Sequence, residues 1–78
     1  MESGPYLYFR WENRSAFRYY AVYLQKDLFN DWCLTRVWGR IDTPLGQIRH
    51  TPVDNYGEGL LQIEQIAKIR KRRGYVLR

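Results

Sequence analysis

The chain is 78 residues long, has a net charge of +5 and contains one cysteine, Cys33. This length accommodates a single small domain over residues 1–78, and an aromatic content of 17% excludes a disordered tail. A lone cysteine excludes an intrachain disulfide and a zinc site built from several thiolates. The chain has no apolar run long enough for a transmembrane helix. Its first residues lack the profile of a signal peptide, so we expect a cytoplasmic protein.

Strand-forming residues dominate the first half of the chain. Their alternation predicts strands over Tyr6–Trp11, Phe17–Gln25 and Trp32–Trp38, and a shorter one over Gln47–Val53. Pro52 indicates that the fourth strand lies at an edge of the sheet or ends there. No glycine-rich turn of a nucleotide-binding fold interrupts this series, which favours a meander of antiparallel strands.

Side-chain alternation also assigns faces to these strands. A loop is expected over Gly39–Gly46, where Pro and Gly interrupt the pattern. Residues expected to share one face of their strand are Tyr20, Val22 and Leu24 in the second, and Trp32, Leu34, Arg36 and Trp38 in the third.

After Asn55 the apolar spacing becomes helical. Asn55 suits a helix N-cap and Gly74 suits a stop, so we expect a helix at about residues 58–73. One such helix packed on one face of a twisted antiparallel sheet of four to five strands is an α+β fold. The helix residues expected to be buried against the sheet are Leu60, Ile63, Ile66 and Ala67.

The positive charge is concentrated at the C-terminal end. Residues 68–78 hold six of the thirteen Lys and Arg residues and none of the acids. Such a block favours an anionic partner, and it is equally consistent with a solvated helix end. Its members are Lys68, Arg70, Lys71, Arg72, Arg73 and Arg78.

Side chains that support catalysis are sparse. His50 is the only histidine, and no Ser or Cys has the sequence context of an activated nucleophile. The scattered carboxylates are most simply solvated turn residues, and Cys33 is most simply a buried small residue. We therefore predict no enzymatic activity, no metal or other cofactor, and no small-molecule substrate.

Binding is better supported, by Trp38–Gly39–Arg40 at the end of the third strand. The indole of Trp38 offers a flat face for stacking on a sugar or base, and Arg40 offers a fork for phosphate. Gly39 removes a side chain that would block close approach. From the residues alone, an alternative stays open: Trp38 belongs to the core and Arg40 to a structural ion pair.

This run resembles the WGR domain, a module of DNA-dependent poly(ADP-ribose) polymerases and of bacterial proteins, including small stand-alone ones. The resemblance covers about residues 6–77, the core of the domain. It lies in the motif Trp38–Arg40, preceded by Arg36 and the aromatic strand Tyr19–Gln25, and followed by Ile41, Gly46–Gln47 and a basic helix ending at Gly74–Tyr75.

The resemblance implies roles for individual residues. In the polymerases the motif's Trp packs on the ribose at a DNA end, and its Arg contributes to binding and to interdomain contacts. These roles would fall to Trp38 and Arg40. Many members carry Gly where this chain has Asp42, and an acid beside Arg40 repels the DNA backbone, so weaker binding is expected. The polymerases' catalytic domain has no counterpart here, so no ADP-ribosyl transfer is implied.

We therefore expect a non-enzymatic nucleic-acid-binding module, with duplex DNA or DNA ends favoured. The alternative is a protein-interaction or homo-oligomerisation domain in which Trp38 and Arg40 form a hot spot. A membrane partner is not expected, because the sheet takes up the apolar stripe of the helix. The residues expected to contact nucleic acid are Trp38, Gly39 and Arg40 at the motif, and Lys68, Arg70, Lys71, Arg72 and Arg73 along the helix end.

Overall fold

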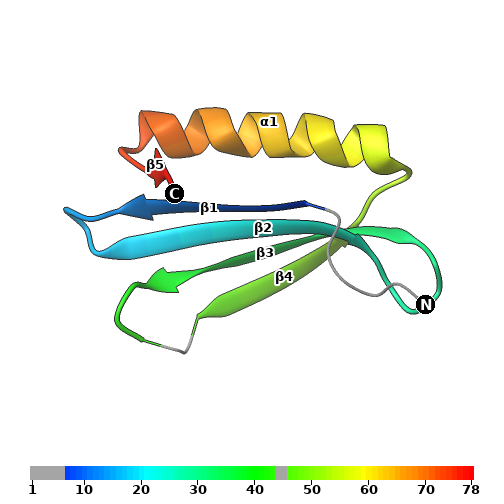
Figure 1. Ribbon diagram of the computed structural model, residues 1–78, viewed down its shortest axis with the longest axis horizontal. Coiled ribbons are helices and arrows are strands. Elements are labelled where there is room, and N and C mark those ends of the chain that lie inside the picture. Colours follow the sequence, from blue (N-terminus) through cyan, green and yellow to red (C-terminus); the bar gives the residue numbers. More distant parts are fainter. Residues whose placement is uncertain (1–6, 44–45) are drawn as a thin grey trace.

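A computed structural model describes residues 7–43 and 46–78. Its five strands form one antiparallel sheet in the order β4-β3-β2-β1-β5, and α1 lies along one face of that sheet (Figure 1). The predicted α+β fold is confirmed. The elements in chain order are β1 (Leu7–Asn13), β2 (Arg18–Lys26), β3 (Trp32–Arg40), β4 (Gln47–Pro52), α1 (Tyr56–Arg72) and β5 (Val76–Leu77).

The strands differ from the prediction mainly at their ends. β2 begins at Arg18 because Phe17 adopts a left-handed conformation, with φ of 57°, in the β1–β2 turn. β3 continues through Gly39 and Arg40, which we expected in the loop, because Gly39 pairs with Tyr19 and Arg40 with Arg18. The predicted residues that lie outside the described ones are Tyr6, Pro44 and Leu45.

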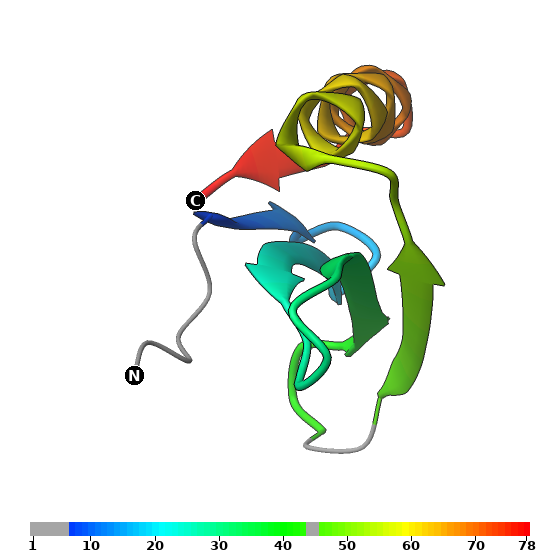
Figure 2. The same ribbon diagram turned by 90° about the vertical axis from the view of Figure 1, so that its right-hand side faces the viewer.

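The core lies between α1 and the helix-facing side of the sheet; Figure 2 shows this arrangement along the axis of α1. Val22, Leu24 and Leu34 are fully buried there, so the predicted common face of Val22 and Leu24 is the inner face of the sheet. α1 presents Ile63 and Ile66 to this layer, as predicted. Partly buried side chains that complete the core are Leu7, Phe9, Tyr20, Trp32, Ala67 and Tyr75.

Leu60, predicted to be buried, is 38% exposed. Gly59 takes its place at the sheet: a Cβ added to Gly59 would lie 2.5 Å from Cδ1 of Leu24. Ile63, Ile66 and Ala67 keep their predicted places against the sheet, so the prediction is wrong only at the start of the buried stripe. The physical reason is close approach, because a glycine at this point lets the helix backbone rest directly on Leu24.

α1 begins two residues earlier than expected, at Tyr56, and Asn55 is its N-cap. The Asn55 side-chain oxygen accepts a hydrogen bond from the backbone N–H of Glu58 at 2.8 Å. The carboxylate of Glu58 in turn accepts from the backbone N–H of Asp54 at 2.6 Å. These two bonds satisfy backbone donors at the start of the helix.

The sheet face that points away from α1 holds two residues singled out from the sequence. Cys33, expected to be buried, is half-buried in β3, next to the β2–β3 turn. His50 is exposed on the edge strand β4, as expected, and its Nδ1 is hydrogen-bonded to Oγ1 of Thr35 at 2.9 Å. Pro52 ends β4, so both indications of that proline are confirmed.

Candidate nucleic-acid interface

Trp38 stacks on Tyr20 across β2 and β3. The two residues are register partners, and their ring centroids lie 5.9 Å apart at an interplanar angle of 19°. Both belong to the helix-facing side of the sheet, and the Trp38 side chain is half-buried. The indole is therefore held by one aromatic partner and still reaches the surface.

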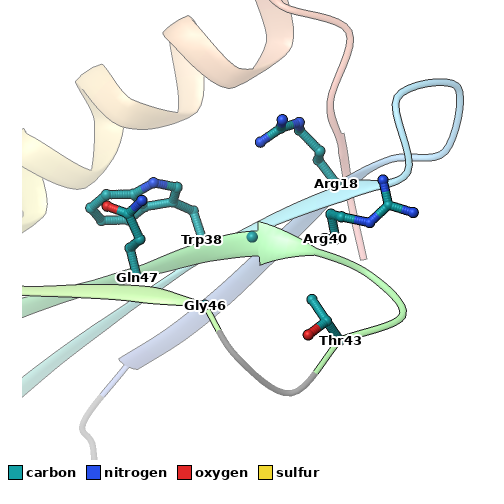
Figure 3. Close-up of a pocket in the computed structure, with 7 residues that line it drawn as sticks. Arg18, Trp38, Arg40, Thr43, Gly46 and Gln47 are labelled. Atoms are coloured by element: carbon teal, nitrogen blue, oxygen red, sulfur yellow. The ribbon is translucent and has the colours of Figure 1, made fainter.

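An open pocket of about 290 Å³ lies beside Trp38. Figure 3 shows the side chain of Gln47 next to the indole, and Arg18 pointing to the same side of the sheet as α1. Arg40 extends from the end of β3, beyond the indole. The lining residues are Arg18, Trp38, Gly39, Arg40, Thr43, Gly46 and Gln47.

Gly46 allows the loop that follows β3 to return tightly against that strand. A Cβ on Gly46 would lie 2.7 Å from the carbonyl oxygen of Trp38 and 2.6 Å from the hydroxyl of Tyr19. No side chain fits there without moving the backbone of β3. Glycine at this position therefore shapes the pocket by letting two segments of backbone approach closely.

Arg40 forms an ion pair with Asp42, the residue at which the chain departs from the family pattern. Arg40 Nε lies 3.3 Å from Asp42 Oδ1, and both side chains are exposed. The guanidinium carbon of Arg40 also lies 5.8 Å from the centre of the Phe17 ring. An exposed pair contributes at most about 1 kcal/mol, so a phosphate can compete with Asp42 for Arg40.

The C-terminal end of α1 is closed by a Schellman motif. Gly74, with φ of +87°, donates its backbone N–H to the carbonyl of Lys71 at 3.1 Å. Tyr75 donates to the carbonyl of Arg70 at 2.9 Å. This pattern satisfies the last carbonyls of the helix and turns Tyr75 back over its final turn.

Arg70 contacts two tyrosine rings as a result. Its guanidinium carbon is 4.2 Å from the centre of Tyr20 and 4.9 Å from that of Tyr75. Because Tyr20 also stacks on Trp38, aromatic contacts run without a break from the basic end of α1 to the indole. The two halves of the predicted site thus lie on the same side of the sheet.

The other basic residues of the helix end differ from Arg70. Arg70 is half-buried, and its Nε is buried without a hydrogen-bond partner among the described residues. The remaining predicted phosphate contacts are exposed, namely Lys68, Lys71, Arg72 and Arg73.

Sequence reasoning missed three residues of this region. Arg18 and Gln47 line the pocket, and Tyr20 supports the indole. Strand alternation placed Tyr20 on one face of β2, but the pairing of Tyr20 with Trp38 depends on the register between β2 and β3. Gln47 is one of the residues that carry the resemblance, with Gly46, but no contact was assigned to it.

The profile of the WGR domain matches residues 5–78. The chain belongs to the WGR domain family. In poly(ADP-ribose) polymerases this domain is a non-catalytic, nucleic-acid-binding module.

The chain is also similar to y4dW, an uncharacterized protein of Sinorhizobium fredii. The two are 33% identical over 63 residues, which cover 81% of this chain and 30% of the relative. The chain therefore spans about a third of that protein's length. No solved structure matches the chain.

Two further properties concern the described part of this WGR domain only. No helix within it is long and apolar enough to cross a membrane. No group of three or more His, Cys, Asp or Glu side chains among residues 7–43 and 46–78 is arranged to hold a metal ion.

Proposed function

We propose that this WGR domain binds nucleic acid, preferring duplex DNA and its ends, and catalyses no reaction. The half-buried indole of Trp38 stacks on a sugar or base that enters the pocket. Arg40 exchanges Asp42 for a phosphate oxygen. The exposed basic residues at the end of α1 supply contacts to the backbone that do not depend on base sequence.

One observation carries this proposal: the unbroken contact from Arg70 through Tyr20 to Trp38. It connects the stacking surface to the basic end of α1 on the same side of the sheet. Each feature alone has a structural explanation: Trp38 could simply be a packed core residue, and the basic residues could simply be a solvated helix end. Together they match what a polynucleotide offers, a flat apolar base or sugar beside a charged phosphate.

A salt titration tests the electrostatic part of the proposal. The apparent affinity for a labelled blunt duplex should fall with salt at a log–log slope of about −3 to −5, at about −0.9 per phosphate neutralised. The triple variant Lys71→Gln, Arg72→Gln, Arg73→Gln should flatten this slope and weaken binding to every duplex sequence equally. Arg70 is left intact, because its removal would disturb the support of Trp38.

A control variant and two control ligands show whether the change in salt slope is specific to the helix end. Arg14→Gln removes one exposed charge of the β1–β2 turn, beside Glu12, and should leave the slope unchanged. Single-stranded DNA and duplex RNA of the same sequence should bind more weakly than the DNA duplex. Equal binding by the triple variant and the wild type contradicts a phosphate-binding role for the helix end.

A protein partner, or a second copy of the chain, is the other candidate. Leu28 and Phe29 in the β2–β3 turn are 98% and 83% exposed. This turn lies at the end of the sheet opposite the Trp38 pocket, because β3 starts at Trp32 and ends at Arg40. Sedimentation equilibrium of the wild type and of Leu28→Ser, Phe29→Ser distinguishes self-association from a monomer.

A further inference from the structure

The helix-facing side of β3 carries positive charge both before and after Trp38. Arg36, Trp38 and Arg40 alternate with residues of the other face, so they follow one another at about 7 Å on this face. Across the sheet, Arg40 is the register partner of Arg18, and Arg36 is the register partner of Arg49. The indole therefore lies between two pairs of arginines.

The pair of Arg36 and Arg49 is unusual for a structural arrangement. Like charges directly opposite each other on neighbouring strands destabilise a sheet. Among the described residues, no carboxylate forms an ion pair with either guanidinium; the acids paired with arginine are Glu12 and Asp42. Within the described part of the chain, no carboxylate therefore neutralises the charges of Arg36 and Arg49.

The hydrogen-bonding capacity of Arg36 is also poorly used. Its Nε is buried without a partner among the described residues. Its Nη2 donates to the Thr51 hydroxyl at 3.4 Å, near the outer limit for such a bond. Arg49, directly opposite, is exposed. An oxyanion between the two guanidinium groups would neutralise the repulsion and accept charge-assisted hydrogen bonds from both.

The position of this pair indicates which anion it takes. Gln47, beside the indole, and Arg49 are exposed neighbours on the same face of edge strand β4, so this path along the sheet is open to solvent. A nucleotide inside a strand carries a phosphate on both sides of its sugar. A sugar or base stacked on Trp38 would then have one phosphate near Arg18 and Arg40 and the next near Arg36 and Arg49.

We propose that Arg36 and Arg49, together with the Thr51 hydroxyl, bind a phosphate of a single strand that continues past the nucleotide stacked on Trp38. The preferred ligand is then a duplex end that carries a single-stranded extension, rather than a blunt end. This inference rests on the proposed function, because it uses the same stacking surface. It adds a second phosphate-binding position to the proposed function, and it specifies a DNA end with a single-stranded extension as the ligand.

The experiment compares one DNA hairpin in two forms, blunt and with a six-nucleotide single-stranded extension, by fluorescence anisotropy. The wild type should bind the extended hairpin about tenfold more tightly, as expected for one additional charge-assisted contact. Arg49→Gln should remove this preference and leave blunt-end affinity within about twofold. Its salt slope should drop by about 0.7 for the extended hairpin only.

Two further variants separate the subsite from a general loss of charge. Arg49→Lys keeps the charge and should retain most of the preference. Arg14→Gln loses the same charge in the β1–β2 turn, beside Glu12, and should retain all of the preference. In the unbound protein, Arg49→Gln should raise Tm, because it removes a like-charge pair; a lower Tm would mean that Arg49 is structural and would overturn the subsite.

The remaining outcomes distinguish this inference from the proposed function. Equal binding of both hairpins by the wild type overturns the subsite and leaves the proposed function standing. Binding of neither hairpin overturns both. If polyglutamate displaces the extended hairpin as efficiently as single-stranded DNA of equal charge does, the subsite binds acidic peptides and the nucleic-acid assignment is wrong.

Discussion

The guanidinium group of Arg70 lies over the ring of Tyr20, with 4.2 Å between its central carbon and the ring centre. The ring centre of Tyr75 lies 4.9 Å from the same carbon. The left-handed turn at Gly74 brings Tyr75 into that position, and Tyr20 in turn stacks on Trp38. The residues that end the helix therefore also help to hold the indole in place.

This relationship predicts that two neighbouring arginines respond differently to the same substitution. Arg70→Gln removes two cation–π contacts and should lower the free energy of unfolding by about 1–2 kcal/mol. Arg72→Gln, at an exposed position, should change it by less than about 0.5 kcal/mol. Urea unfolding followed by tryptophan fluorescence measures both. Equal losses for the two variants would show that Arg70 acts only as a surface charge.

Two glycines at the start of α1 provide a second matched pair. Gly59→Ala places a Cβ 2.5 Å from the fully buried side chain of Leu24, so overpacking should cost about 1–3 kcal/mol. At exposed Gly57 the nearest atom to an added Cβ is the Asn55 side-chain oxygen, 3.3 Å away. Gly57→Ala should be neutral or stabilise by up to about 1 kcal/mol, because alanine favours the helix. Stabilisation by Gly59→Ala would contradict the described orientation of α1.

Glu12 makes stability depend on pH. It accepts a hydrogen bond from Arg10 at 3.0 Å and another from Arg14 at 3.0 Å, and Arg78 lies 3.5 Å away. The bond from Arg10, supported by that from Arg14, holds the pKa of Glu12 below its ordinary value. Its stabilising contribution is therefore present above the unfolded-state pKa, about 4.3, and is lost as the pH falls through the lower folded-state pKa.

Glu12→Gln should consequently reduce stability at pH 7 and have a smaller effect in acid, below the unfolded-state pKa. The difference in unfolding free energy between wild type and variant, measured by urea unfolding at several pH values, should shrink as the pH falls below about 4.3. Glu64→Gln, at an exposed position of α1, serves as the control and should give a nearly constant difference. If the difference in unfolding free energy between wild type and Glu12→Gln grew on acidification, a lowered pKa of Glu12 in the folded protein would be contradicted.

The fold could be predicted largely from alternation and helical spacing, and so could the burial of Ile63 and Ile66, but the first contact of the helix with the sheet could not. The spacing of Leu60 and Ile63 indicated a buried stripe, whereas the structure buries Gly59 with Ile63. Apolar periodicity records side-chain hydrophobicity. It gives glycine no weight as a contact residue. The pattern therefore selected Leu60, whereas the backbone at Gly59 comes closest to Leu24.

The two parts of the candidate site could be predicted separately, but their connection could not. Trp38 followed from the motif and Arg70 from the charge block, while Tyr20, which links them, depends on strand register. That register is set partly by turns in which Phe17 and Asn30 adopt φ of 57° and 68°. Non-glycine residues in this conformation are uncommon, so the residue types alone do not show how these turns align the strands.

The central claim is that Trp38 contacts nucleic acid, and the sharpest test compares a DNA end with a closed circle. An end exposes a nucleotide with one open face, and stacking on it contributes about 1–3 kcal/mol. Trp38→Ala should therefore weaken binding to a short blunt duplex by about tenfold to a hundredfold and hardly change binding to a covalently closed circle of similar composition. Arg40→Gln should show the same selectivity with a smaller effect on stability.

The measurement is a set of paired affinity titrations on end and circle, with Tm recorded for every protein. The account predicts that folded Trp38→Ala loses affinity for the end alone. Equal affinity of wild type and folded Trp38→Ala for the blunt duplex, or equal binding of circle and end by the wild type, would contradict it.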